Sequence, residues 1–333
     1  MRAKLLLILI CLCLAGCGRY ADFTFPALRE AAHDVRYRVD SRPAPLLGRG
    51  AAGDWDSSDV LNPSVVLDRG VYYNLYSGFD GRTWRTGLAI SRDGIAWTKK
   101  GEVLAPDTST WEGDYIAANG SVLVQNGEFL YWYQAGSPPR IGLARSRDAR
   151  HWTKLAKPVV ELGPRGSWDE EGVADPDVVA FGDSLYLFYL GQDRARRQRL
   201  GIAVSKDGVR WTKLRSNPIL ELGGPGAFDE NGLGEPAVWA AGGWYWMLYT
   251  GRNRAEHRGI GLARSRDGVH WNRVSEQPVF TGQEAWNSAV VCDPSIEVQG
   301  SSVRVWYGGG DIPRPDERLN GQIGLFTLTT EAR

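Results

Sequence analysis

The chain of 333 residues has no excess of charge of one sign, because 39 basic side chains balance 39 acidic ones. A general nucleic-acid binder normally carries a basic excess, so we expect no nucleic-acid partner. The long runs of Ala, Leu, Glu and Lys typical of helical bundles are missing, as are a P-loop, a dinucleotide fingerprint and a His-Glu-x-x-His zinc motif. The chain is instead rich in glycine, with 41 residues, and in tryptophan, with 14. Its apolar content of 43% is enough for a core.

Cysteine is scarce, and the N-terminal sequence lowers the number that remains for the fold. Two basic residues precede an apolar run too short to span a membrane, which is typical of a secretory signal. Residues 14–17, Leu-Ala-Gly-Cys, resemble a bacterial lipobox; the other interpretation is an ordinary signal peptide cut nearby. The lipobox predicts a signal peptide over residues 1–16, a lipid on Cys17 and a tether over residues 17–33. Cys292 is then the one cysteine left, which excludes an intramolecular disulfide and a cysteine-rich metal site.

The same N-terminal sequence predicts the location of the protein. We expect an exported monomer that is attached to the bacterial cell envelope through its lipid alone. Glycine, not aspartate, follows the lipobox cysteine. The resemblance to outer-membrane lipoproteins therefore implies the outer membrane, if the host has one.

Three motifs recur along the chain with a period of about 57 to 60 residues. A turn motif, Ser-x-Asp-x-x-x-Trp, occupies residues 91–97, 146–152, 205–211 and 265–271. A second motif, a polar residue that proline usually follows, begins at Asn62, Asn119, Asp175, Glu235 and Asp293. A third is an aromatic run that ends in Tyr and Gly, as at residues 185–191. Each repeat therefore predicts four short antiparallel strands, about the content of one propeller blade.

The motif counts predict how the repeats close into one body. Five copies of the second motif exist but only four of the turn motif, so the last repeat lacks its fourth strand. Residues 33–39 resemble a fourth strand and can supply it from the N-terminal end. Closure of this kind removes exposed sheet edges. We therefore predict an all-β fold, a single five-bladed β-propeller over residues 34–333, with its ring closed by an N-terminal strand.

The second motif also predicts a polar ring at one mouth of the channel, because the first strand of each blade borders the channel. Asn, Asp and Glu interchange at this position while the proline mostly stays, so the proline looks structural and the polar residue specific to a site. Like charges held together raise at least one pKa, which makes a carboxyl group a usable general acid. The ring predicts three catalytic carboxyl groups, Glu235, Asp293 and Asp175, and two substrate-binding amides, Asn62 and Asn119. The other interpretation is that these residues merely shape the start of each blade.

Outside the ring, the most informative residues lie in loops that differ between repeats. Thirteen of the 14 tryptophans fit the repeats, and only Trp84 sits in a loop that does not repeat. We predict that Trp84 stacks on a sugar and that Arg252, one of several loop arginines, binds substrate. A second set of acidic residues upstream of the ring, such as Asp169 and Asp229, is open to two interpretations. These carboxylates are either solvated or engaged in turn hydrogen bonds.

The repeats and the acidic residues before proline resemble the five-bladed glycosidases. This group of arabinanases, β-xylosidases, invertases and levansucrases includes glycoside hydrolase families 43 and 32. The resemblance covers nearly all of residues 34–330. It implies cleavage of glycosidic bonds in an oligo- or polysaccharide, with one carboxyl group protonating the leaving oxygen and another activating water or attacking directly.

The chain also departs from that resemblance. Those enzymes generally carry a catalytic Asp in the first blade, a supporting Asp in the second and an acid Glu in the third, whereas Asn62 and Asn119 occupy the first two blades here. A rotated arrangement would make Glu235 the general acid, with Asp293 and Asp175 as base and pKa modulator. The alternative is a non-catalytic propeller that binds glycan or is associated with the envelope or its exopolysaccharide. The resemblance allows a Ca²⁺ ion in the channel, but no ligand set identifies one, so we expect no cofactor and no metal.

Overall fold

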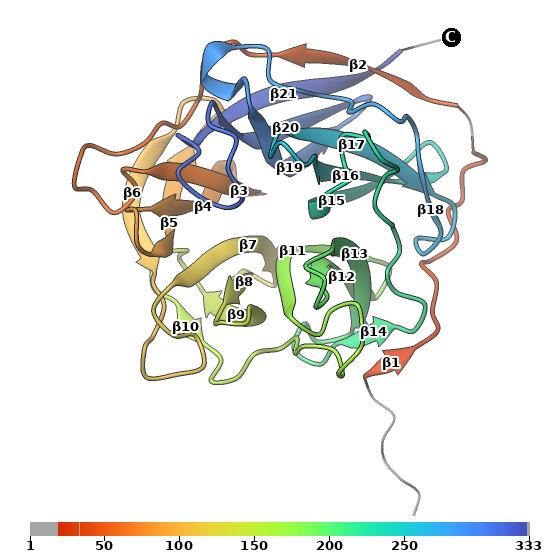
Figure 1. The fold of residues 1–333 in the computed structure, drawn as a ribbon, viewed down its shortest axis with the longest axis horizontal. Helices are drawn as coiled ribbons and strands as arrows, with labels where there is room; N and C mark the ends of the chain where they lie inside the picture. Colours follow the sequence, from red (N-terminus) through yellow and green to blue (C-terminus); the bar gives the residue numbers. More distant parts are fainter. Residues whose placement is uncertain (1–18, 33, 332–333) are drawn as a thin grey trace, which may run out of the picture.

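The computed structural model describes residues 19–32 and 34–331, and its regular elements are almost entirely β-strands (Figure 1). The predicted signal peptide and the predicted lipidation site at Cys17 lie outside the described residues. Within them, the 3₁₀ turn η1 (Ala285–Asn287) is the one helical element, and no helix is long and apolar enough to cross a membrane. The all-β class predicted from the repeats is confirmed.

The strands follow one another as antiparallel meanders that match the sequence repeats, and we call these meanders units 1 to 5. Unit 1 has β3 (Asp59–Asp68), β4 (Val71–Phe79), β5 (Trp84–Ser91) and β6 (Thr98–Leu104); unit 2 has β7 (Ile116–Gln125), β8 (Glu128–Ala135), β9 (Arg140–Ser146) and β10 (Thr153–Lys154). Unit 3 has β11 (Gly172–Phe181), β12 (Ser184–Gln192), β13 (Gln198–Ser205) and β14 (Thr212–Leu214); unit 4 has β15 (Gly232–Ala241), β16 (Trp244–Arg252), β17 (Arg258–Ser265) and β18 (Trp271–Arg273). Unit 5 has β19 (Val290–Gln299), β20 (Ser302–Gly310), β21 (Gln322–Glu331) and, as its fourth strand, β2 (Arg36–Ser41).

The N-terminal strand β2 pairs antiparallel with β21. The prediction that an N-terminal strand supplies the fourth strand of the last repeat is therefore confirmed. Units 1 and 2 share one eight-stranded sheet through a short parallel pairing of β5 with β7, and β1 (Tyr20–Ala21) adds a fifth strand to unit 3. The five first strands face a common centre (Figure 1), and each contacts the first strands of its two neighbours.

A recurring hydrogen bond joins neighbouring first strands. Its acceptor side chain lies two residues after the polar ring position of one unit, and its donor is a backbone N–H of the next unit. The backbone N–H donors and their acceptors are Val122 to Ser64 Oγ (2.8 Å), Val178 to Ser121 Oγ (2.9 Å), Val238 to Asp177 Oδ2 (3.1 Å) and Val65 to Ser295 Oγ (2.9 Å). The last of these bonds joins unit 5 back to unit 1. Only unit 4 lacks a side-chain acceptor at this position, because Ala237 occupies it. These bonds fix the spacing of the first strands around the centre.

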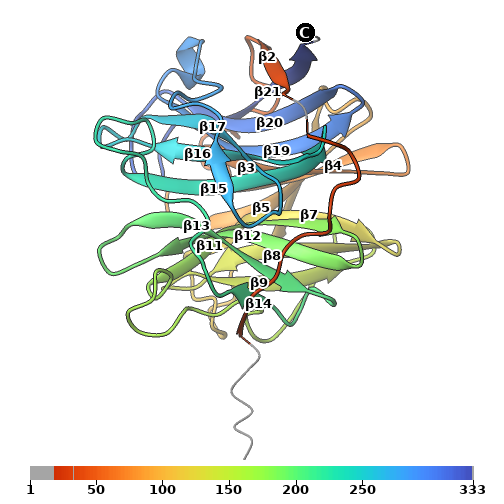
Figure 2. The same cartoon turned by 90° about the vertical axis from the view of Figure 1, so that its right-hand side faces the viewer.

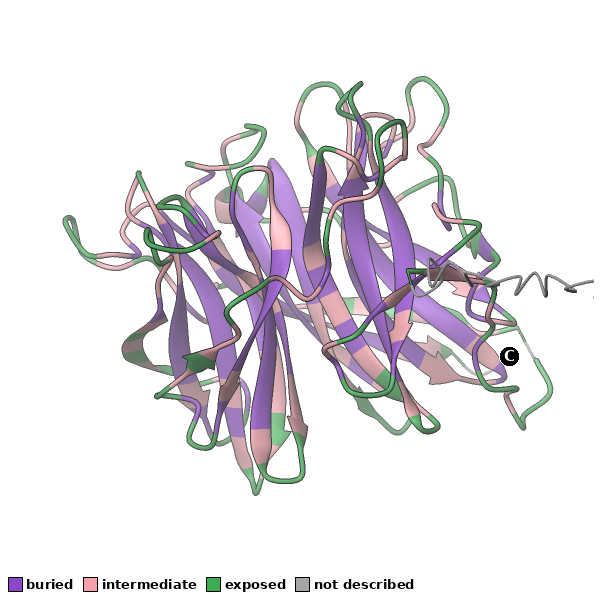
Figure 3. Ribbon diagram, turned by 90° about the horizontal axis from the view of Figure 1, so that it is seen from below, coloured by how far each residue is buried: buried purple, intermediate pink, exposed green. Residues whose placement is uncertain are grey.

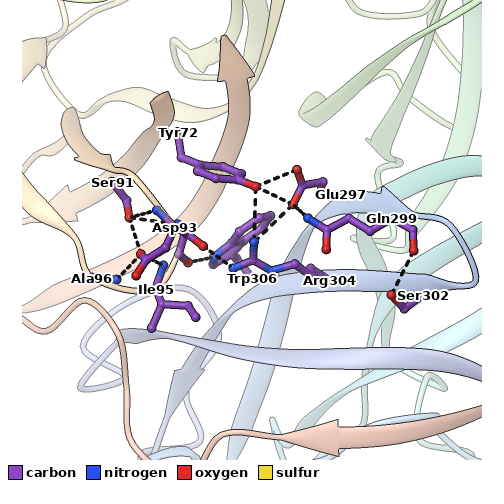
Figure 4. Close-up of polar contacts among 11 residues, drawn as sticks. Tyr72, Ser91, Asp93, Ile95, Ala96, Glu297, Gln299, Ser302, Arg304 and Trp306 are labelled. Carbon is purple, nitrogen blue, oxygen red and sulfur yellow. Dashed lines mark hydrogen bonds and ion pairs between the residues drawn. The ribbon is translucent and has the colours of Figure 1, made fainter. Parts of the chain in front are cut away.

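The turn motif is scaffold. In unit 1, Asp93 Oδ1 accepts the backbone N–H groups of Ile95 and Ala96, both at 2.8 Å, and these bonds lower the pKa of Asp93 to about 2. Figure 4 shows this turn beside unit 5, where Trp306 Nε1 donates to the carbonyl of Gly94 at 2.8 Å. Tryptophan, tyrosine and phenylalanine side chains fill the space between adjacent sheets, so burial is concentrated in the strands and exposure in the loops at both ends (Figure 3). Tryptophan richness therefore belongs mainly to the packing between units.

The segment predicted as a tether over residues 17–33 packs onto the domain over its described residues 19–32 (Figure 2). Tyr20 and Ala21 pair in parallel with β14, and Phe25 is only 5% exposed, with its ring centroid 3.9 Å from that of Tyr186. The tether prediction is therefore wrong for these residues. The physical reason is the alternation of apolar side chains at positions 21, 23 and 25, which buries one face of an extended segment. We call residues 19–32 the strap.

Candidate active site

The five predicted ring residues lie around one central cavity of about 310 Å³. Each sits at a β-bulge, where the register between the first and second strands of its unit shifts. Each also has a positive φ, which is 47° at Asn62, 47° at Asn119, 47° at Asp175, 49° at Glu235 and 55° at Asp293. A positive φ is costly for residues other than glycine, and a bulge re-aims a side chain. The repeated strain therefore accompanies five side chains that line the cavity.

Asp293 is the most enclosed member of the ring, with 5% exposure. Asn62 holds both of its oxygens, through its backbone N–H to Oδ2 at 3.0 Å and its side-chain Nδ2 to Oδ1 at 2.8 Å. The Cys292 thiol donates to Oδ2 at 3.1 Å. Burial, followed by the charge of Glu235, raises the pKa of Asp293 well above its ordinary value. Asp293 is thus a fixed, desolvated carboxyl group.

Glu235 lies beside Asp293 and stays partly exposed in the cavity. Its Oε2 accepts the backbone N–H of Asp293 at 3.3 Å, and Thr250 Oγ1 accepts the same N–H at 3.2 Å. The bulge of unit 5 therefore orients the carboxylate of unit 4. Its other oxygen is not committed to that bond, which suits a reacting group.

Asp175, on the other side of Glu235, is also partly exposed in the cavity. Burial, followed by the charge of Glu235, raises the pKa of Asp175 to about 8. Asn119 Nδ2 donates to Asp175 Oδ1 at 3.4 Å, and Asn119 is itself held by Ser77, whose Oγ accepts its backbone N–H at 2.9 Å. Its environment therefore favours the protonated form of Asp175, next to a second partly exposed carboxyl group.

Asp177 is a further acidic residue of the cavity, two positions along β11 from Asp175. Burial raises the pKa of Asp177 to about 7. Its repeat position carries serine in three units, and its Oδ2 accepts an N–H of the next unit as those serines do. Asp177 therefore belongs to the bonds that join the units.

Arg258, at the start of β17, is the cation that sequence reasoning missed. Burial by itself lowers the pKa of Arg258. The neighbouring acidic groups, Cys292 first and then Glu235, outweigh burial and raise this pKa above its ordinary value. Its Nη2 donates to the carbonyls of Arg314 and Pro315, in the loop that connects β20 to β21. The same loop is also hydrogen-bonded to unit 1, because Asp59 of β3 accepts the backbone N–H groups of Arg318, Leu319 and Gly321. No repeat motif marks Arg258, so only the folded chain reveals its place.

Trp84 does not lie where the sequence predicted. It is the first residue of β5, is 4% exposed, and stacks on Phe79 with a centroid distance of 4.6 Å and an interplanar angle of 17°. The predicted sugar platform is therefore wrong: Trp84 is core, because the β4–β5 register places it opposite Phe79. Tyr115 is the exposed aromatic residue here, at 41%, with its hydroxyl donating to Glu317 at 2.9 Å.

Arg252 has both terminal nitrogens engaged. Nη1 donates to Glu256 at 3.0 Å and Nη2 to Gln198 at 2.9 Å, which ties the loops of units 3 and 4 together. These bonds give Arg252 a structural role between the two units. That Arg252 also binds substrate stays a prediction.

Four members of the second acidic set, one from each of units 1 to 4, are neither solvated nor arranged for catalysis, because they are buried against a tyrosine and a basic residue. The groups are Asp56 with Tyr76 and Lys99, Glu112 with Tyr133 and Lys154, Asp169 with Tyr189 and Lys213, and Asp229 with Tyr249 and Arg273. In unit 3, Lys213 Nζ lies 2.6 Å from Asp169 Oδ2. Each basic residue comes from the fourth strand of its own unit, so the set links that strand to the loop before the first strand.

Among the described residues, Glu235, Cys292 and Asp293 have potential ligand atoms within 4.8 Å of one another. Calcium takes six to eight oxygen ligands, so a thiol in this set does not suit it. The Cys292 thiol and Asn62 already donate hydrogen bonds to the two Asp293 oxygens. The group is therefore explained by hydrogen bonding and does not fit the Ca²⁺ that the resemblance allowed.

Known proteins are similar to this chain in sequence and in fold. The chain is 26% identical over 235 residues to an uncharacterised protein of Mycobacterium tuberculosis, covering 64% of this chain and 75% of that protein. It is 28% identical over 169 residues to a 1,2-β-oligomannan phosphorylase of Thermoanaerobacter sp., covering 48% of this chain and 52% of that enzyme. A solved glycosyl hydrolase from Bacteroides ovatus superposes with a TM-score of 0.71 at 17% identity, over 90% of this chain and 96% of that one.

A family model gives the assignment. The model described as the glycosyl hydrolases family 32 N-terminal domain matches residues 70–215 and again residues 134–306. Two overlapping matches are expected of a chain built from repeats, since one model fits in two registers. Because these matches together run from residue 70 to residue 306, the chain belongs to the glycosyl hydrolase family 32 N-terminal domain family.

Proposed function

We propose that the chain cleaves glycosidic bonds of an oligo- or polysaccharide, and that units 1 to 5 are the blades of one five-bladed propeller closed by β2. The observation that carries the proposal is the neighbouring pair Asp175 and Glu235, two partly exposed carboxyl groups of one cavity. Glycosidic bond cleavage needs one carboxyl group that is protonated and one that is ionised. A shared environment that raises the pKa of Asp175 to about 8 supplies the first.

In the proposed reaction Asp175 is the general acid. It gives its proton to the leaving oxygen as the bond between that oxygen and the anomeric carbon breaks. Glu235 then either takes a proton from the attacking water or forms the covalent sugar ester that water later hydrolyses. The sequence-based hypothesis instead had Glu235 as the general acid, with Asp293 and Asp175 as base and pKa modulator. The raised pKa of Asp175 and the N–H that Asp293 donates to Glu235 both favour the new assignment.

The remaining ring residues act as positioning groups in this proposal. Asp293 orients Glu235 through its backbone N–H and is itself held by Asn62. Asn119 holds Asp175. The two asparagines therefore take the place of carboxylates that would otherwise add charge to a crowded site.

A second candidate reaction, phosphorolysis, is favoured by one observation. Arg258 places a positive charge next to Glu235, and an inorganic phosphate attacking in place of water would need a cation there. A phosphorylase among the relatives points the same way. A single arginine also suits hydrolysis, so we keep hydrolysis as the first proposal.

The test is a panel of glycosides incubated with the chain, with and without inorganic phosphate. The panel holds fructosides, arabinans, xylosides and β-1,2-mannosides, and the readout is released sugar or sugar phosphate. We expect release by the wild type and a loss of at least about 100-fold in Glu235→Gln and Asp175→Asn. Glycan binding without release in any member of the panel would contradict the proposal and leave the non-catalytic glycan-binding alternative.

We also propose export and lipid attachment at Cys17, on the lipobox at residues 14–17. Metabolic labelling with a fatty acid tests it: the label should appear in the wild type and be absent from Cys17→Ser. Equal labelling of the two would overturn this part of the proposal.

A further inference from the structure

The connection between the second and third strands of unit 5 departs from the repeat. In units 1 to 4 this connection covers residues 80–83, 136–139, 193–197 and 253–257, whereas in unit 5 it covers residues 311–321, which we call the long loop. The register of β19 with β20 pairs Val290 with Gly310, so the long loop begins at the end of the strands where the first strand enters the ring. It therefore lies at the mouth of the catalytic cavity.

The long loop is fixed to the units on both sides of unit 5. From unit 4, Arg258 Nη2 donates to the carbonyls of Arg314, at 3.2 Å, and of Pro315. From unit 1, Asp59 Oδ1 accepts the backbone N–H of Leu319 at 2.9 Å, and both of these residues are fully buried. The loop therefore has a fixed course from unit 4 to unit 1 across the mouth.

Two acidic residues, Asp316 and Glu317, occupy the stretch between these attachments. Asp316 is exposed, and Glu317 accepts the Tyr115 hydroxyl of unit 2 at 2.9 Å. After burial and the charge of Glu235, the charge of Asp316 adds to the rise in the pKa of Asp175. Asp316 therefore lies next to Tyr115 and within electrostatic reach of the proposed general acid.

Tyr115 is an exposed aromatic residue with a fixed backbone. It directly precedes β7, and its carbonyl accepts the backbone N–H of Trp84 at 2.8 Å, beside the β5–β7 pairing. Its side chain is 41% exposed although its hydroxyl is bonded to the long loop. A sugar ring presents an apolar C–H face and hydroxyl donors. An exposed aromatic ring beside free carboxylate oxygens offers a partner to each.

We propose that Tyr115 and Asp316 form a substrate-binding subsite that holds one sugar unit of the glycan at the mouth of the cavity. This inference rests on the proposed function and deepens it. The Tyr115 ring contacts the apolar face of the sugar, and the Asp316 carboxylate accepts hydrogen bonds from its hydroxyl groups. Because two carboxylates repel each other, the subsite takes an uncharged sugar unit and not a uronic acid.

The experiment measures steady-state kinetics of the full chain on the glycoside that the panel identifies. Asp316→Ala should raise KM about tenfold and leave kcat within about twofold of the wild type. Tyr115→Phe keeps the ring and should raise KM less than Tyr115→Ala does. The matched control, Asp183→Ala, removes an exposed carboxylate from the β11–β12 hairpin, at the opposite end of the strands, and should leave KM unchanged.

The outcomes separate this inference from the proposed function. Release by the wild type, with KM unchanged in both Asp316→Ala and Tyr115→Ala, would overturn the subsite and leave the proposed function standing. If the wild type releases no sugar, calorimetric titration with the same glycans decides. Binding that Tyr115→Ala weakens would keep the subsite, whereas unaffected binding, or none, would overturn it.

The selection for an uncharged sugar has its own test. Oxidation of a primary hydroxyl group of the glycoside to a carboxylate should raise the KM of the wild type, and should do so less in Asp316→Ala. An equal rise in the two chains would overturn the charge selection.

Discussion

Asn62 donates hydrogen bonds to both carboxyl oxygens of Asp293, at 3.0 Å from its backbone N–H and at 2.8 Å from its side-chain Nδ2. These two residues come from the first strands of units 1 and 5, so the contact that joins the ends of the repeat also builds the site. Asp293 in turn donates its backbone N–H to Glu235. The contact between the first and last units and the orientation of the proposed reacting carboxylate are therefore coupled through one pair.

That coupling predicts the effect of Asn62→Gly. Glycine accepts the φ of 47° at this position but removes the side-chain donor to Asp293. A hydrogen bond contributes about 0.5–1.5 kcal/mol of net stability, and glycine offsets that loss by relieving the backbone strain at this φ. We expect turnover to fall about tenfold or more with little change in the thermal midpoint. Steady-state kinetics and a melting curve check this, and wild-type turnover in Asn62→Gly would contradict it.

The buried pair Asp169 and Lys213 should matter for stability and not for chemistry. Lys213→Ala leaves the carboxylate of Asp169, which is fully buried, without its partner at 2.6 Å. Removing one member of a buried pair costs about 3–5 kcal/mol. Lys206→Ala is the control: it breaks an exposed pair with Asp183, a kind worth about 0–1 kcal/mol. Denaturant unfolding measures both, and equal losses would contradict the scaffold role.

Asp177 should make stability depend on pH. Its pKa is about 7 in the folded chain and about 3.9 in an unfolded one. A raised folded pKa means that the folded state holds the proton more tightly, so the stabilisation is full below about pH 4 and is lost as pH rises through 7. We expect the thermal midpoint of the wild type to fall over this window. Asp177→Asn keeps an acceptor for Val238 and should flatten the fall; an unchanged slope would be contrary to this expectation.

Tyr115 and Trp84 should separate substrate binding from folding. Tyr115 is exposed and donates to Glu317, in the loop that also binds Arg258, so Tyr115→Ala should raise KM several-fold and leave the unfolding midpoint nearly unchanged. Trp84→Ala should cost about 3–5 kcal/mol of stability, because it empties a core position. Kinetics and calorimetry on the two variants check the contrast. A Trp84→Ala chain that melts like the wild type but binds sugar poorly would restore the original sugar-platform hypothesis.

Sequence reasoning located the ring because a polar residue recurs at the same place in every unit, followed by proline in four of the five. Residues at the same place in successive repeats occupy equivalent positions in space. It located β2 because the motif counts left one strand missing. It failed where repetition says nothing. Trp84 was misjudged because its partner Phe79 lies across a hairpin whose register is not visible in composition. Arg258 was missed because its acidic neighbours come from two different units and a loop.

The strap was missed for a different reason. The alternation of Ala21, Phe23 and Phe25 can be read in the sequence, but the segment lies between the predicted lipid anchor and the first predicted strand, so we predicted a tether there. An extended segment with one apolar face needs a receiving groove, and the groove exists only once units 3 and 4 have packed together.

The pH dependence of kcat/KM, on whichever glycoside the panel identifies, tests the central claim most directly. If Asp175 is the general acid, it must be protonated to act, so kcat/KM should fall as pH rises through about 8. Asp175→Asn should lose nearly all activity on that glycoside at every pH. A wild-type profile that stays level through about pH 9, or an Asp175→Asn chain with wild-type kcat/KM, would contradict the account.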